Sequence, residues 1–169
     1  MNEILDTGRR REFNTGAVRD ICEGKGRCDL LPLDVIADIY ARTIPEEPDI
    51  GNVFEQIAKF REDGNTLHLE HALASFIDYK GYRGWCDTFL ELAVHFEAGA
   101  EKYGVDNWRK GIPVHCYIDS AVRHYLKFLR GDMDERHDRA FCWNVMCCIW
   151  TMKHMPEMDD FTVVGKENE

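Results

Sequence analysis

The chain has 169 residues, a net charge of −10 and 44% hydrophobic residues. This length and composition predict one globular domain over residues 1–169 and exclude a largely disordered protein. The negative charge argues against a nucleic-acid or acidic-membrane binder, because such proteins present extended basic surfaces. An anionic ligand would therefore need a local basic cluster or metal ions.

The cysteine content and the start of the chain indicate the cellular compartment in which the protein is expected. Seven cysteines occur without a CxxC pair, and three of them lie close together at 142, 147 and 148. We expect them to be reduced, small apolar packing residues rather than zinc ligands. The start of the chain is polar and no apolar run is long enough to cross a membrane, which predicts a cytoplasmic protein.

The first half of the chain predicts an irregular N-terminal region followed by short helices. Residues 1–14 are charged and aperiodic, which predicts a loose arm. Residues 15–32 contain EGKGR and end in proline, which predicts a turn-rich loop carrying Arg19, Lys25 and Arg27. Apolar spacing then predicts helices at about 33–43, 53–62 and 66–79, the last with Thr66 as its N-cap.

The stretch from Phe89 to Trp108 begins as an apolar-periodic helix that carries two carboxylates. With about 100° per residue, Glu97 and Glu101 share an arc with apolar residues of the same helix (Leu90, Ala93 and Val94). We therefore expect both acids to point toward the core. A buried acid requires a cationic partner or a bound cation. The two acids are therefore solvated, or paired with cationic side chains in a structural role, or ligands of a hard metal such as Mg²⁺.

The second half of the chain predicts a loop and two further helices. Residues 102–113, KYGVDNWRKGIP, are rich in glycine, asparagine and proline and predict a loop. A helix over about 117–130 has an apolar stripe and an opposite charged stripe (Asp119, Arg123, Lys127 and Arg130), which we expect to be solvated. A last helix over about 135–155 is apolar on most sides. No alternating strand pattern is found, so the predicted class is all-α.

The last helix repeats the arrangement of an acidic pair on an apolar face. Glu135 and Asp138 are spaced ExxD at its start, where a favourable interaction with the helix dipole is the alternative explanation. Two helices that aim carboxylates into a bundle form a site for Mg²⁺ or Mn²⁺. Such ions assist the hydrolysis of phosphoanhydrides, which is therefore the reaction class that the two pairs indicate.

Four motifs occur together in the chain: TGAVRD at 15–20, GKGRCDLLP at 24–32, EAGAEKYGVDNWRKGIP at 97–113, and DSAVRHYLKFLRGDMDE at 119–135 followed by WN. This set resembles the phage-type dATP/dGTP diphosphohydrolases, all-α nucleotide pyrophosphatases related to MazG and the dimeric dUTPases. The resemblance implies a MazG-like helical bundle that cleaves purine (d)NTPs to the monophosphate and pyrophosphate with Mg²⁺ or Mn²⁺. It also implies a homodimer or homotetramer in the cytoplasm of a bacterial or phage-infected cell.

The resemblance assigns roles to particular residues. Glu97 and Glu101 would be catalytic and would bind metal, although they are spaced ExxxE where the family has ExxE. Glu135 and Asp138 would complete the metal site, with Asp134 as a replacement for either. The triphosphate would be held by basic residues, and the base by an amide and an indole. The phosphate-binding set is Lys25, Arg27, Lys102, Arg109, Lys110, Arg123 and His124, and the base-binding set is Asn107 and Trp108.

Two other functions compete with this one. His137-Asp138 is an HD dipeptide and His68 and His71 form a helical i, i+3 pair, which are features of an HD-type phosphohydrolase that releases triphosphate. The second rival is a non-catalytic helical module that binds nucleotides or a protein partner. In that case the acidic pairs would be neutralised internally, by Arg123 and Arg139.

Overall fold

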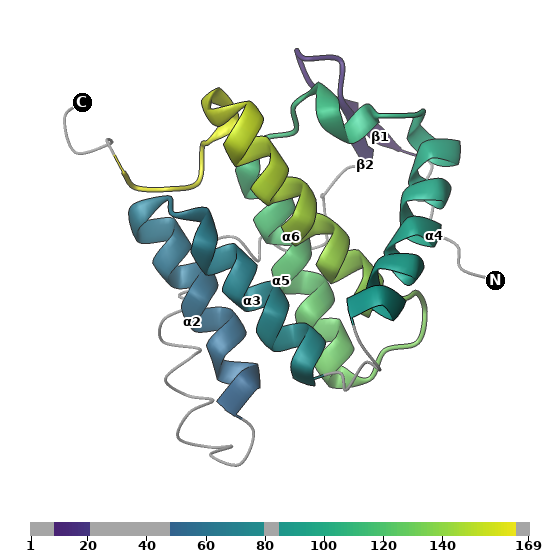
Figure 1. Cartoon of the computed structure of the whole chain (residues 1–169). Helices are drawn as coiled ribbons and strands as arrows, with labels where there is room; N and C mark the ends of the chain where they lie inside the picture. The colour runs from purple at the N-terminus through teal and green to yellow at the C-terminus, as the bar shows by residue number, and fades with distance from the viewer. Residues whose placement is uncertain (1–8, 21–47, 80–84, 165–169) are drawn as a thin grey trace. The chain divides into compact units, whose positions relative to one another are not determined.

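The computed structural model describes residues 9–20, 48–79 and 85–164, with side chains described throughout except at 48–51 and 85–88. These ranges are helical apart from one short hairpin (Figure 1), which confirms the all-α class. The chain forms two compact units, Met1–Leu30 with Phe89–Asp160 and Leu31–Thr88 with Phe161–Glu169. The single domain expected over 1–169 stays a prediction. Within the described ranges, no helix is long and apolar enough to span a membrane.

One unit contains a pair of helices, α2 (Pro48–Asp63) and α3 (Thr66–Tyr79), which pack along each other (Figure 1). The buried side chains of these two helices are Val53, Phe54, Ile57, Phe60, Leu69, Ala72, Leu73, Phe76 and Ile77. Helix α2 begins at Pro48, five residues before the predicted start at 53. Proline suits a first helical position, because its missing N–H needs no partner there.

The turn between α2 and α3 corrects the predicted cap. Asn65 Oδ1 accepts a hydrogen bond from the backbone N–H of Leu67 at 3.1 Å, so Asn65 caps α3 and Thr66 is its first helical residue. Gly64 precedes it with φ +69°, in the left-handed region that favours glycine. Phe161 packs on Phe60 of this unit with ring centroids 6.2 Å apart.

The other unit has α5 (Val114–Arg130) and α6 (His137–His154) at its centre (Figure 1). The two helices pack along each other, with Tyr125 and Phe141 in ring contact at 5.3 Å. Helix α6 begins at His137 rather than at Glu135. The acid therefore lies in the connection before the helix, and the predicted ExxD helical turn is wrong.

Helix α4 (Trp85–Tyr103) buries the face opposite to the predicted one. Leu92 is buried, and His95 and Phe96 contact Trp143 of α6, each with ring centroids 6.0 Å apart. The arc expected to be core is exposed instead, including Leu90 at 69%, Val94 at 39%, and both Glu97 and Glu101. Thus the two acids do not point into a core.

A hairpin of β1 (Arg10–Glu12) and β2 (Val18–Asp20) corrects the expectation of a loose arm and of no strand. Asn107 attaches it to the 3₁₀ turn η2 (Asn107–Lys110). The Asn107 side chain accepts from Val18 N–H at 3.0 Å and donates to Val18 C=O at 2.8 Å. The turn lies in the stretch expected to be a loop. The predicted helix at 33–43, and Lys25 and Arg27, lie outside the described residues.

Candidate active site

A cavity of about 760 Å³ lies within the unit formed by the hairpin, α4, η2, α5 and α6. Ligand sites in proteins typically span about 300–1,000 Å³, so a nucleotide would be accommodated. Charged groups of both signs face it, which suits an anionic ligand accompanied by a cation. The ionisable lining residues are Arg11, Arg19, Asp20, His95, Glu97, Tyr103, Asp106, His115, Cys116, Asp119, Arg123, His124, Lys127 and Glu135.

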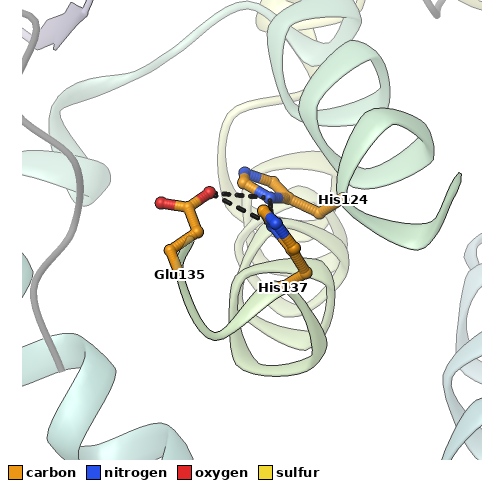
Figure 2. A group of neighbouring side chains, drawn as sticks. All are labelled: His124, Glu135 and His137. Atoms are coloured by element: carbon orange, nitrogen blue, oxygen red, sulfur yellow. Dashed lines mark hydrogen bonds and ion pairs between the residues drawn. The ribbon is translucent and has the colours of Figure 1, made fainter. Parts of the chain in front are cut away.

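Three possible metal ligands converge where α5 meets the start of α6 (Figure 2). His124 Nδ1 and His137 Nδ1 lie 3.1 Å and 3.3 Å from Glu135 Oε1, and 3.0 Å from each other. Ligand atoms about 2.1 Å from a divalent ion are separated by roughly 3.0–3.4 Å in octahedral or tetrahedral geometry. The spacing of the three atoms therefore fits a shared ion.

Asp134 fixes the orientation of the His137 ring. His137 Nε2 donates to Asp134 Oδ1 at 2.6 Å, and Lys127 Nζ donates to Asp134 Oδ2 at 3.0 Å. These hydrogen bonds, from Lys127 first and then His137, hold the pKa of Asp134 well below its ordinary value. With Nε2 as the donor to Asp134, Nδ1 is the ring nitrogen that faces Glu135. A carboxylate–histidine pair of this kind commonly supports a metal ligand.

Burial keeps the nearby imidazoles neutral. It is the main cause that lowers the pKa of His124, against the hydrogen bond and charge of Glu135, which raise it. His95, which also lines the cavity, has its pKa lowered to about 4, again mainly by burial. A neutral imidazole is the form that binds metal ions, so the cavity favours the ligating form of His124.

A second group of possible ligands, Asp132, Asp134 and His137, lies at the outer side of the same connection. Its two acids are already paired with cations, since Asp132 pairs with Arg130 and Asp134 with Lys127. A bound ion would have to compete with these pairs. We therefore place the candidate centre at His124, Glu135 and His137.

The carboxylates predicted to bind metal have different positions in the structure. Glu135 belongs to the cluster and Glu97 lines the cavity from α4, whereas Glu101 is exposed and is not among the lining residues. Asp134 supports His137. Asp138 is buried and pairs with Arg136 at 2.9 Å, so it contributes to the start of α6.

The hairpin contributes guanidinium groups to the cavity wall. Arg19 Nη2 donates to Asn144 Oδ1 at 2.6 Å, and its Nη1 is buried with no hydrogen-bond partner among the described residues. Arg11 likewise has a buried Nε without such a partner in this part of the chain. Buried donors are normally satisfied, so these two groups indicate where an anionic ligand would bind.

Two of the predicted phosphate-binding residues, Arg123 and Lys102, are engaged in largely buried ion pairs. Arg123 pairs with Asp119, which is only 4% exposed, and both line the cavity. The charged stripe of α5 is therefore partly buried rather than solvated. Lys102 Nζ pairs with Asp20 Oδ2 at 3.0 Å in a largely buried contact that joins α4 to β2.

The remaining predicted residues divide between the cavity and the surface. Trp108 lines the cavity and packs edge-on against Phe96 at 5.5 Å. Arg109 and Lys110 are exposed and are not lining residues. Asn107 lines the cavity, is 6% exposed and binds the Val18 backbone with both ends of its amide, which are structural contacts. Base binding by Asn107 stays a prediction that these contacts do not support.

Sequence reasoning missed several residues of the cavity and of the histidine–glutamate cluster. Arg11 was placed in the loose arm, and His137 was considered only as part of the HD dipeptide. The signal for His137 was the pair of histidines that bracket the turn before α6, His124 and His137, with Glu135 between them. Nothing in the spacing identified Arg11 or Asn144, because their positions depend on the hairpin.

Comparison with known proteins identifies one family. The model described as "dATP/dGTP diphosphohydrolase, N-terminal" matches residues 85–161, which are somewhat under half of the 169 residues. That range contains α4 to α6 and the whole histidine–glutamate cluster, but not the hairpin. No curated protein and no solved structure in the comparisons matches the chain. The resemblance predicted from the sequence is therefore confirmed over residues 85–161, which carry the dATP/dGTP diphosphohydrolase N-terminal pattern.

Proposed function

We propose that the protein hydrolyses dATP, dGTP or a related purine nucleoside triphosphate to the monophosphate and pyrophosphate, with a divalent metal ion. The observation that carries this proposal is the convergence of His124, Glu135 and His137 beside a cavity that also receives arginine side chains. The family match over 85–161 supplies the substrate class. Arg11 and Arg19, with their unsatisfied buried donors, would bind the phosphates.

The donor set bears on which ion is used. Two imidazoles and one carboxylate suit a transition ion better than Mg²⁺, which prefers oxygen ligands. We therefore propose Mn²⁺ as the more effective of the two ions expected from the sequence. Glu97 would add a carboxylate from α4, and Trp108 or Trp143 would offer an aromatic face to the base.

The ion, when bound, would polarise the phosphoryl group and make an attacking water more acidic. The chain's own residues would do the rest. Asp134 holds His137 in the tautomer whose Nδ1 lone pair faces the cluster. Arg19, itself oriented by Asn144, would hold the leaving pyrophosphate by charge-assisted hydrogen bonds.

An HD-type phosphohydrolase is the second candidate, because the cluster contains His137 of the HD dipeptide and a second imidazole. It would release triphosphate and a nucleoside. Against it, Asp138 of the same dipeptide pairs with Arg136 at the start of α6. The reaction products distinguish the two candidates.

The test is to incubate each of the eight (d)NTPs with the protein and Mn²⁺ or Mg²⁺, and to separate the products by anion-exchange chromatography. Monophosphate and pyrophosphate from dATP or dGTP are expected. Release of triphosphate would establish the HD-type reaction. No turnover with either ion would favour the non-catalytic helical module.

The cluster itself is tested by Glu135→Gln, which should reduce turnover by at least about 100-fold. Glu157→Gln is the matched control, since Glu157 is exposed in η3 (Pro156–Met158) and does not line the cavity. Both variants should keep the thermal transition of the wild-type protein. Unchanged turnover in Glu135→Gln would rule out the proposed centre.

Assembly as a homodimer or homotetramer is proposed from the resemblance alone. Light scattering after size exclusion should give a mass of at least twice the 19.7 kDa of one chain. A mass equal to one chain would contradict it.

A further inference from the structure

At the opening of α5, a cysteine, a histidine and an aspartate form a continuous hydrogen-bonded chain. Cys116 Sγ lies 3.2 Å from His115 Nε2, and His115 Nδ1 lies 2.5 Å from Asp160 Oδ2. A nucleophile within hydrogen-bond reach of a base that is itself oriented by a third group is the arrangement of activated nucleophiles. The hydrolysis proposed above uses none of these three residues.

Asp160 holds both the backbone and the ring of His115. Its Oδ1 accepts from the His115 backbone N–H at 3.0 Å while its Oδ2 binds the ring. The first N–H groups of a helix have no partner inside the helix, so Asp160 also satisfies one of these at the start of α5. The imidazole therefore has one defined orientation, with Nε2 toward the sulfur.

Two cationic groups face Cys116. The hydrogen bond to Asp160, followed by that to Cys116, raises the pKa of His115 to about 10, so the ring is protonated at neutral pH. Arg11 Nη2 donates to Cys116 Sγ at 2.8 Å from β1. Charged donors on a sulfur, and a position in the first turn of a helix, are both features of reactive cysteines.

The sulfur is reached from the cavity. Cys116, His115 and Arg11 are all lining residues, although Cys116 is only 4% exposed to bulk solvent. The other cysteines with described side chains, Cys142, Cys147 and Cys148, are buried in α6 and do not line the cavity. Burial raises the pKa of the Cys147 and Cys148 thiols. These three therefore serve as internal controls.

We propose that Cys116 is a modification site at which small hydroperoxides oxidise a thiolate held by His115, Asp160 and Arg11. The sulfur attacks one peroxide oxygen, an S–O bond forms and the O–O bond breaks. Sulfur is oxidised by two electrons to sulfenic acid, and the peroxide is reduced. The hydroxide or alkoxide that leaves takes a proton from the His115 imidazolium and departs as water or an alcohol. This inference does not depend on the nucleotide-hydrolysing activity.

The experiment treats the full-length protein with hydrogen peroxide and dimedone, which labels sulfenic acid, and assigns the label to each cysteine by peptide mass spectrometry. Cys116 should be labelled at least about tenfold faster than Cys142, Cys147 and Cys148. His115→Gln and Asp160→Asn should each slow the labelling of Cys116. Equal labelling of the four cysteines, or no slowing in a folded variant, would overturn the proposal.

A measurement on the wild-type protein covers the case in which the variants fail to fold. Alkylation of Cys116 by iodoacetamide at neutral pH should be at least about tenfold faster than alkylation of Cys142, Cys147 and Cys148, because its sulfur lines the cavity and is contacted by two cationic donors. Alkylation of Cys116 no faster than that of these three cysteines would refute the proposal independently of any substitution.

Discussion

His137 Nε2 donates to Asp134 Oδ1 at 2.6 Å, and this hydrogen bond determines which ring nitrogen faces Glu135. A carboxylate only accepts hydrogen bonds, so Nε2 carries a proton, and Nδ1 is the ring nitrogen that faces Glu135. The same Asp134 is held by Lys127. The candidate centre thus depends on a residue that does not belong to it.

Replacing Asp134 should therefore weaken metal binding without removing a proposed ligand. We expect Asp134→Ala to lower the affinity for Mn²⁺ by about 10–100-fold, the usual effect of losing a carboxylate that supports a metal-bound histidine. Electron paramagnetic resonance of free Mn²⁺ measures this directly. Asp132→Ala is the matched control, since Asp132 pairs with Arg130 in the same connection. Equal losses in the two variants would contradict the supporting role.

Asn107 should prove to be structural. Asn107→Ala removes two hydrogen bonds and leaves a backbone N–H and C=O of Val18 without their partner. We expect the free energy of unfolding to fall by about 1–3 kcal/mol in urea denaturation. Lys110→Ala, exposed on the same turn, should change it by less than about 0.5 kcal/mol. A stable Asn107→Ala protein with weaker purine binding would restore the base-binding role.

The sequence predicted the helices well where one face is strongly apolar. The apolar stripe of α5 and the position of α3 follow directly from periodicity. The inward face of α4 could not be read in this way, because it carries His95 and Phe96 beside a cavity rather than a dense aliphatic core. Periodicity of apolar residues therefore selected the wrong side of the helix.

The candidate site was predicted only in part, for two physical reasons. The start of α6 lies two residues later than predicted, so Glu135 is in a turn and meets His124 instead of pairing with Asp138. The positions of Arg11 and Asn107 depend on a hairpin of three-residue strands, which is too short to show an alternating pattern. Long-range contacts of this kind leave no local signal.

Gly111 should be less tolerant of a side chain than Gly131, although both have positive φ. A Cβ on Gly111, at φ +98°, would lie 2.8 Å from Met155 Cε and 3.1 Å from Met158 Sδ, whereas one on Gly131, at φ +83°, meets nothing within 4 Å. Gly131→Ala should cost about 1 kcal/mol from backbone strain alone. Gly111→Ala should cost slightly more, about 1–2 kcal/mol, since the flexible ends of the two methionine side chains must also shift. Thermal denaturation of both variants measures the difference, and equal losses would show that the two methionines move aside freely.

The His115–Asp160 pair should make stability depend on pH. The pKa of His115 is raised from 6.5 to about 10, mainly by the hydrogen bond to Asp160, so the folded protein binds a proton that the unfolded chain releases. The stability from this pair is fully present below pH 6.5 and is lost as the pH rises toward 10. Urea denaturation of the wild-type protein and of His115→Gln should therefore show a difference in unfolding free energy that shrinks between pH 6.5 and 10. The comparison cancels the titration of other groups common to both proteins. A difference that stays constant over this range would show that His115 is not held as an imidazolium by Asp160.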